Sequence, residues 1–160
     1  MSAFHFSDGQ SVVEGDFSQL EELIGALKEK HYVDIGVFGS GVTGDGQPIA
    51  EYGAYNEFGS VTKPDHPPKR SFIRMPLQSR QDKIGAYVQR NARGHLEKAD
   101  IKAIFEDIGI AGESVIQEAF DTRGFGQWKE NADSTIKRKQ SDAPLIDEGT
   151  LRHAISHRTE

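Results

Sequence analysis

The sequence predicts a mixed α/β (α+β) protein in which a small antiparallel or mixed sheet packs against two or three helices, with long Gly/Pro-rich loops between them. Residues Val33–Phe38 form an apolar, β-branched run that is typical of a strand. Several other stretches repeat apolar residues at helical spacing, and many of the 17 glycines and 6 prolines fall between such stretches. A chain of 160 residues has the usual size of one domain, so we expect a single domain over residues 1–160.

The composition excludes several classes of function. The chain carries 25 acidic and 19 basic side chains and a formal charge of −6. This balance argues against sequence-independent binding of nucleic acid, which relies on clustered Lys and Arg. It contains no cysteine, so disulfides, thiolate zinc sites and cysteine nucleophiles are ruled out. The N-terminus lacks the pattern of a secretory signal, and no apolar run approaches the length of a membrane span. We therefore expect a protein that is made and folded in a cytosol.

The N-terminal third begins with a polar stretch and continues into an amphipathic helix. Residues 1–15 are expected to be a flexible N-terminus or a short strand. A helix should begin at Asp16 or Ser18, where Ser18 and Glu21 have capping-box spacing, and end near Lys30. Its apolar residues share one face: Phe17, Leu20, Leu23, Ile24 and Leu27.

A strand, a loop and a second helix are expected next. Val33–Phe38 has the apolar continuity of a buried strand. Residues 39–48 contain four glycines and a proline, which indicates a flexible loop. Residues Ile49–Phe58 place Tyr52 and Tyr55 at helical spacing, so we favour a short helix there.

Proline dominates the middle of the chain. Residues 59–71 form a Pro-rich arm that cannot pair as a central strand. Ser71–Met75 is expected to be a short strand. Pro76 then suits the first position of a helix that ends near Arg93.

The strongest helical signal follows. Asp100 is expected to cap a helix whose apolar stripe continues to Phe120. Gly109 and Gly112 interrupt this stripe and indicate a close helix crossing or a bend, because glycine costs about 1 kcal/mol relative to alanine in an exposed helix. Residues 124–142 are polar and expected to be mobile, and 148–156 can form a last helix.

The glycine loop also matches Gly-x-Gly-x-x-Gly, at Gly39, Gly41 and Gly44. In a dinucleotide fold the third glycine lies in the first turn of a helix whose N–H groups bind the pyrophosphate. Here Gly44 is followed by Asp-Gly-Gln-Pro, which cannot form that turn. A nucleotide-binding enzyme that uses residues 39–44 therefore remains a weak alternative.

The remaining chemical candidates are isolated. His153 and His157 would share a helical face, as metal-ligand pairs do, but two surface imidazoles are the better interpretation. Glu51 and Glu57 could do acid/base work in principle, although charges on a solvated face are commoner. The basic cluster Lys137–Lys139 is read as part of a loop that touches an acidic partner. We predict no catalytic residue, no metal, no cofactor and no enzymatic activity.

Aromatic, arginine and turn residues are instead concentrated in two segments, 51–60 and 67–74. Aromatics and arginine are enriched at the anchors of protein–protein interfaces, although core packing is an equal alternative for the aromatics. The candidate contact residues, including two from a later segment, are Tyr52, Tyr55, Asn56, Phe58, Pro67, Pro68, Phe72, Arg74, Leu145 and Asp147.

Three ordered blocks resemble the tailed-bacteriophage virion morphogenesis proteins, which include tail-completion and neck proteins of lambda-like and Mu-like phages. The blocks are AEYGAYNEFGS at 50–60, PPKRSFIR at 67–74, and STIKRK at 134–139 followed by PLIDEGTL at 144–151. Glu148 departs from the threonine common in the family. The resemblance covers roughly residues 33–155.

The resemblance implies a non-enzymatic structural protein of the virion, made in the host cytoplasm, at the head–tail interface. Such a protein is expected to form a homo-oligomeric ring, of six- or twelve-fold symmetry with the neck. Its expected partners are the head–tail connector or stopper and the tail terminator or tail tube, with DNA passing unbound and no membrane. A tail terminator ring that caps the tail tube is the alternative within this class, and a nucleic-acid-binding module is a further one outside it.

Overall fold

The computed structural model describes residues 3–7, 10–14, 16, 18–59, 68–147 and 149–160. The chain is a mixed α/β protein, as predicted. The described residues form four strands and seven helices in this order: β1 Ala3–Ser7, β2 Gln10–Glu14, α1 Ser18–Lys28, β3 Val33–Val37, α2 Ile49–Phe58, α3 Arg74–Ser79, α4 Gln81–Leu96, α5 Ile101–Asp121, α6 Asp133–Lys139, α7 Thr150–His153 and β4 Ile155–Thr159.

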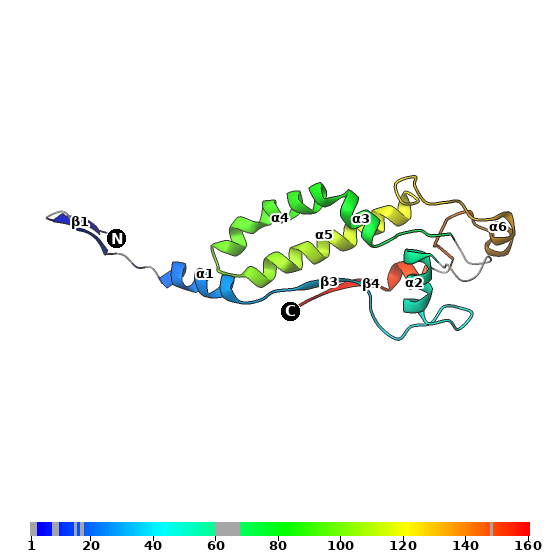
Figure 1. The fold of residues 1–160 in the computed structure, drawn as a ribbon, viewed down its shortest axis with the longest axis horizontal. Helices are drawn as coiled ribbons and strands as arrows, with labels where there is room; N and C mark the ends of the chain where they lie inside the picture. The colour runs from blue at the N-terminus through cyan, green and yellow to red at the C-terminus, as the bar shows by residue number, and fades with distance from the viewer. Residues whose placement is uncertain (1–2, 8–9, 15, 17, 60–67, 148) are drawn as a thin grey trace.

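The body is elongated and layered (Figure 1). Strands β3 and β4 pair antiparallel, with Val33 opposite Thr159 and Val37 opposite Ile155. Helix α5 lies along this two-stranded sheet, and α4 packs on α5 on the side away from the strands. The hairpin β1–β2 lies at one end of the molecule and α6 at the other. The long α5 is thus the element on which the other layers of the body are built.

Helix α5 forms as the sequence predicts, and its two glycines explain how it meets the sheet. The Asp100 carboxylate accepts a hydrogen bond from the Ala103 N–H at 3.0 Å, which caps the helix start. A Cβ on Gly109 would lie 2.1 Å from His157 Cδ2, and one on Gly112 would lie 2.3 Å from Ile35 Cδ1. The close approach expected at these glycines is therefore chiefly to the two strands, with Leu77 of α3 also 3.3 Å from a Cβ on Gly112, and α5 continues through both positions.

The apolar core lies where α5 ends, near α2 and α7. Phe72, Ile116 and Phe120 are almost completely buried there. Phe120 meets both Phe72 and Trp128 edge-on, with ring centroids 5.9 and 5.5 Å apart, a favourable geometry for aromatic pairs. The rest of the buried cluster consists of Ile49, Ala119, Leu145, Leu151 and Ile155.

The first predicted helix is confirmed, and it begins at one of the two predicted starts. Helix α1 begins at Ser18, whose N–H donates to Asp16 Oδ1 at 3.0 Å. Phe17 lies outside the described residues. Strand β3 coincides with the predicted strand, but it is only partly buried rather than fully buried. The reason is that it has one partner strand and that Asp34 points to solvent.

Two predictions in the middle and at the end of the chain are wrong. Ser71–Met75 forms no strand, because helix α3 already begins at Arg74, and Pro76 is its third residue. The helix break at Arg80 then separates α3 from α4. The last expected helix, 148–156, is only the four-residue α7, after which the chain extends to pair with β3. Pairing with β3 satisfies the backbone groups of 155–159 more completely than an exposed helix end does.

Some expectations about loops are not tested. The N-terminal stretch contains the hairpin β1–β2, and the segment 124–142 contains α6. The flexibility predicted for 1–15 and 39–48 and the mobility predicted for 124–142 stay predictions. Most of the Pro-rich arm 59–71 lies outside the described residues. Within the described part of the chain, no helix is long and apolar enough to cross a membrane.

The contact of Gly109 with β4 yields a test of this layering. Gly109→Ala places a methyl group against the His157 ring, so we expect a loss of about 1–3 kcal/mol in the free energy of unfolding, as for other overpacked sites. Gly85→Ala is the matched control, since a Cβ there meets nothing within 4 Å on α4. It should stabilise by about 0.5–1 kcal/mol. Urea unfolding measures both, and equal effects would contradict the packing described.

Candidate functional site

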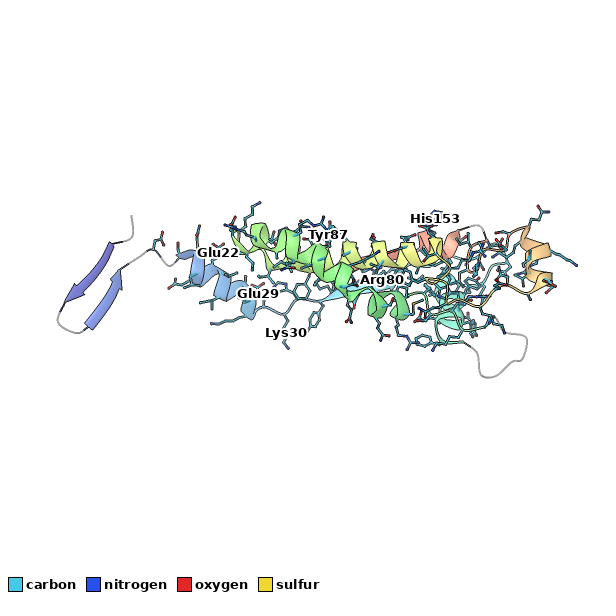
Figure 2. All side chains as sticks on the ribbon, turned by 90° about the horizontal axis from the view of Figure 1, so that it is seen from above. Glu22, Glu29, Lys30, Arg80, Tyr87 and His153 are labelled. Carbon is cyan, nitrogen blue, oxygen red and sulfur yellow. The ribbon has the colours of Figure 1, made fainter. Side chains whose placement is uncertain are left out.

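A cavity of about 690 Å³ opens between α2, α6 and the loop before α7, at the end of the molecule remote from the hairpin β1–β2. We call it the α2–α6 cavity. Figure 2 shows side chains crowded at this end. Five of the ten predicted contact residues line it: Tyr52, Asn56, Pro68, Leu145 and Asp147. The structure therefore gathers residues from three distant segments around one opening.

A buried carboxylate, that of Glu57, follows directly after the cavity-lining residue Asn56. Glu57 Oε2 accepts hydrogen bonds from the N–H groups of Phe72 and Ile73 at 2.7 and 2.9 Å. Glu57 Oε1 accepts from Ser71 Oγ at 2.7 Å and from Nε of Arg74 at 2.9 Å, with the Arg74 N–H at 3.2 Å. These are the N–H groups that the start of α3 leaves unpaired. Glu57 thus caps α3 from another helix.

The capping by Glu57 explains why 71–75 is not a strand. The donors that a strand would present to a neighbouring strand are turned together onto one carboxylate. Burial alone would raise the pKa of Glu57, but its hydrogen bonds from Ile73, Ser71 and Arg74 outweigh burial, so the pKa is lowered. Glu57 is therefore a structural anion with its oxygens engaged by the chain. Glu51 is exposed and accepts from Tyr55 Oη at 3.0 Å, so the two carboxylates do not form an acid/base pair.

Arg70 lines the cavity and connects several of the segments around it. Its guanidinium is buried and donates to the carbonyl oxygens of Lys129 and Glu130 at 2.7 and 2.9 Å, and to Asn131 Oδ1 at 3.2 Å. Asn131 in turn donates to the carbonyl of Ala143 at 3.1 Å. The Arg70 N–H also donates to the carbonyl of Asn56 at 2.7 Å. One arginine thus joins α2, the segment before α6 and the segment after it.

The rim of the cavity carries both signs of charge. Arg138 and Lys139 come from the last turn of α6, where the helix dipole favours cations, and Asp147 faces them across the opening. Lys139 Nζ donates to the carbonyl of Ala143 at 3.2 Å, and burial lowers its pKa. Among the described residues, Arg138 and Asp147 make no hydrogen bond or salt bridge, although Asp147 attracts Lys139 electrostatically and Arg138 attracts Asp45.

The floor of the cavity is apolar and strained. Leu145 is buried, with 4% of its surface exposed, and it adopts a left-handed backbone with φ of 60°. Such a conformation costs a bulky residue about 1–3 kcal/mol and persists only where the surroundings hold it. Here the residue before it, Pro144, is fully buried. The surrounding packing thus holds Leu145 in this conformation, with its side chain lining two openings of the surface.

The glycine loop borders the second opening, of about 290 Å³, which shares Tyr52, Arg138 and Asp147 with the first. Within the loop, the Thr43 N–H donates to the carbonyl of Gln47 at 2.8 Å, and Val42 bridges to Pro48. The loop therefore folds back on itself before α2 begins at Ile49. Gly44 does not lie in the first turn of a helix, as the sequence predicts.

The other predicted contact residues are placed differently. Phe58 is 63% exposed, and the Arg74 guanidinium stacks 4.6 Å from its ring centroid, so this pair forms a separate surface feature. Phe72 is a core residue, with only 1% of its surface exposed. Tyr55 is half-buried beside Glu51. Pro67 lies outside the described residues.

Sequence reasoning missed the residues that build the cavity. Glu57 and Arg70 stand inside the two blocks that were singled out, but charged residues there read as solvated rather than buried. The only local signal is that each stands within two residues of a phenylalanine, Phe58 or Phe72. Arg138 and Lys139 were noted as a basic cluster and expected in a loop, whereas they lie on α6.

The predicted histidine pair is separated by a change of secondary structure. His153 lies in α7 and His157 in β4, so they do not share a helix face. His157 Nδ1 lies 2.7 Å from Glu113 Oε1, and its Nε2 lies 2.9 Å from Glu106 Oε1. Among the described residues, no group of three or more His, Asp or Glu side chains is placed to hold a metal ion. His157 instead fastens β4 to α5.

Comparison with protein-family models, with curated proteins and with solved structures gave no significant match. The arrangement itself offers a cation, a carboxylate, amide and hydroxyl groups and an apolar floor around one opening. Such a site suits the binding of a peptide segment, because a peptide presents the complementary donors, acceptors and side chains.

Removing the charge of Glu57 tests its capping role. Glu57→Gln weakens the hydrogen bonds to Ser71–Arg74, and we expect a loss of about 2–4 kcal/mol in the free energy of unfolding. Glu51→Gln, an exposed change on the same helix, should cost within about 0.5 kcal/mol. Because folding lowers the pKa of Glu57, its contribution is present above its ordinary pKa of 4.5 and is lost as the pH falls through the lowered value. Denaturant unfolding at pH 7 and at acid pH measures both effects.

The stability should also depend on the charge of His157. Burial alone would lower the pKa of His157, but hydrogen bonds to Glu113 and Glu106 outweigh burial and raise the pKa above its ordinary value of 6.5. The stabilisation is therefore complete below pH 6.5 and is lost as the pH rises through the raised pKa. His157→Gln should flatten this fall in the free energy of unfolding, and His153→Gln, at an exposed position, should not. An unchanged slope in H157Q would contradict the assignment.

Proposed function

We propose that the protein is a structural component of a tailed-phage virion, a tail-completion or neck ring subunit that joins the tail to the capsid connector. One observation carries this proposal: all three blocks that resemble the family contribute to the α2–α6 cavity. Tyr52 and Asn56 come from the first block, Pro68 from the second, and Arg138 and Leu145 from the two parts of the third. A shared pattern that converges on one opening is expected when the pattern serves recognition.

The physical properties of the cavity support a docking role. Arg70 fixes one wall through buried hydrogen bonds, so little conformational entropy is lost there when a partner segment enters. Arg138 and Asp147 are charged and make no hydrogen bond or salt bridge among the described residues. A neighbouring subunit or ring that supplies a carboxylate to one and a cation to the other gains charge-assisted hydrogen bonds.

The proposed role implies an oligomer, specific neighbours in the virion and functions for the loops. The protein forms a homo-oligomeric ring, of six- or twelve-fold symmetry with the neck, and contacts the connector or stopper on one side and the tail terminator or tail tube on the other. Its small sheet packs on two or three helices, and its Gly/Pro-rich loops 39–48 and 59–71 act as arms. The formal charge of −6 lets DNA pass through the ring without being bound. The protein resides in the virion after synthesis in the host cytoplasm.

Loss of the protein in a phage that encodes it tests this function. We expect a nonsense mutation in its gene to leave filled heads and free tails that do not join, visible by negative-stain electron microscopy. Purified protein added to such an extract should restore infectious particles. Complete particles without the protein would refute the proposal, and tails of irregular length with no free heads would indicate the terminator role instead.

Charge reversal at the cavity tests the docking surface. Arg138→Glu should reduce the restoration of infectious particles at least about tenfold, because one charge-assisted hydrogen bond contributes about 1.5–3 kcal/mol. Lys137→Glu makes the same change one residue earlier on α6, at a residue that does not line the cavity, and should restore normally. Both variants should keep the melting temperature of the wild type. Equal activity of the two would exclude the α2–α6 cavity as the docking site.

A further inference from the structure

Helix α1 exposes an apolar stripe that nothing in the described chain covers. Leu20, Ile24 and Leu27 are spaced four and three residues apart, so they lie on one face of the helix. Their exposed fractions are 51%, 43% and 58%, large values for leucine and isoleucine. An amphipathic helix normally places such a stripe against the rest of the protein.

The body of the molecule occupies a different side of α1. Leu23 and Ala26 are partly buried, and a cleft of about 410 Å³, lined on α1 by Gln19, Leu20, Glu22 and Leu23, separates this side of the helix from the turn between α4 and α5. Leu20 thus stands at the edge between the cleft and the exposed stripe. At 100° per residue, this side is about a quarter turn away from the exposed stripe. Helix α1 therefore contacts its own chain only lightly, since none of its residues is fully buried, and its apolar stripe is free.

The end of the molecule that carries α1 also lacks other support. The hairpin β1–β2 extends beyond α1 and pairs only with itself among the named elements, as Figure 1 shows. An isolated two-stranded hairpin is marginally stable in water, and an isolated helix of 11 residues is also marginal. Both elements gain stability if this end packs against another molecule.

Two opposite charges flank the stripe on its outer side. Glu21 and Lys28 are seven residues apart, so they lie almost above one another, on the side of the stripe away from the body. When two such helices pack antiparallel, equivalent flanks face each other, and Glu21 of each copy meets Lys28 of the other. In a parallel pair this flank would face the opposite flank, which carries Gln19 and Ala26 and no charge.

We propose that α1 is a self-association site, in which the Leu20–Ile24–Leu27 stripe of one chain packs antiparallel against the same stripe of a second copy. The contact is isologous, because both copies use the same surface around a two-fold axis. Two ion pairs between Glu21 and Lys28 fix the antiparallel direction, as flanking charges do in coiled coils. This contact is separate from the α2–α6 cavity and does not rest on the function proposed above.

The expected affinity is low. A pair of 11-residue helices buries less surface than the roughly 1,200–2,000 Å² of a standard stable interface. We therefore expect a monomer–dimer equilibrium in the micromolar range or weaker, measured on the full chain by sedimentation equilibrium from about 5 to 500 µM. The average mass should rise from 17.7 kDa toward twice that value. Ile24→Asp, at the centre of the stripe, should shift the midpoint at least tenfold.

Charge exchange tests the direction of the pair. Glu21→Lys puts two lysines on the flank and Lys28→Glu puts two glutamates there, so each variant alone should associate more weakly than the wild type. An equimolar mixture of E21K and K28E should associate again, because each chain then offers the charge that the other needs. Added salt should weaken the association of the mixture, since exposed ion pairs are screened.

Glu22→Lys is the matched control. It makes the same charge change in the same turn of the helix, so it alters the helix dipole equally, but Glu22 faces the cleft beside the body (its position on α1 is labelled in Figure 2). E22K should dimerise like the wild type, with unchanged circular dichroism in all variants. A wild-type chain that is monomeric at 500 µM, association unaffected by I24D, equal effects of E21K and E22K, or no recovery in the mixture would each overturn the proposal.

Discussion

The structure depends on one buried carboxylate. Glu57, near the end of α2, collects the N–H groups of 72–74 and the hydroxyl of Ser71, and so starts α3 where the chain would otherwise extend. This turn inserts Phe72 into the core beside Phe120 and brings Arg70 close to α2. Arg70 then donates hydrogen bonds to the carbonyl groups of Lys129 and Glu130. The core and the cavity wall are therefore consequences of the same anion.

The two ends of the molecule differ in how completely they are packed. At the α2–α6 end, buried hydrogen bonds and the aromatic contacts of Trp128 fix the backbone around an open cavity, and the strained Leu145 is held in place. At the α1 end, the helix exposes its apolar stripe and the hairpin β1–β2 pairs only with itself. We propose that the first end offers a rigid surface to a partner and that the second gains stability from association. Both properties suit a subunit of a larger assembly.

Hydrophobic periodicity predicted the elements that are determined by residues close together in sequence. Helix α5 follows from its Asp100 cap and its apolar stripe, and α1, β3 and α2 lie close to their expected positions. Periodicity could not predict the fate of Ser71–Met75, because Glu57, which ends its extended form, lies fourteen or more residues away in sequence. It likewise could not place His157 on a strand, since the partner strand β3 lies more than 100 residues earlier in the sequence. Half of the candidate contact residues meet at the cavity, and the charged groups that shape it were missed because their burial is a tertiary property.

The sequence by itself determined the mixed α/β class, the positions of the main helices, and the failure of the glycine loop to open a helix, because each depends on residues within a few positions of one another. Only the tertiary structure decided which residues share a surface. Gly109 and Gly112 allow α5 to approach the two strands closely, and residues from the three family-like blocks line one cavity. The physical reason is that Glu57 and Arg70 can be buried only because they bind hydrogen-bond partners that are distant in sequence. The local sequence does not show those partners, so it predicts two solvated charges.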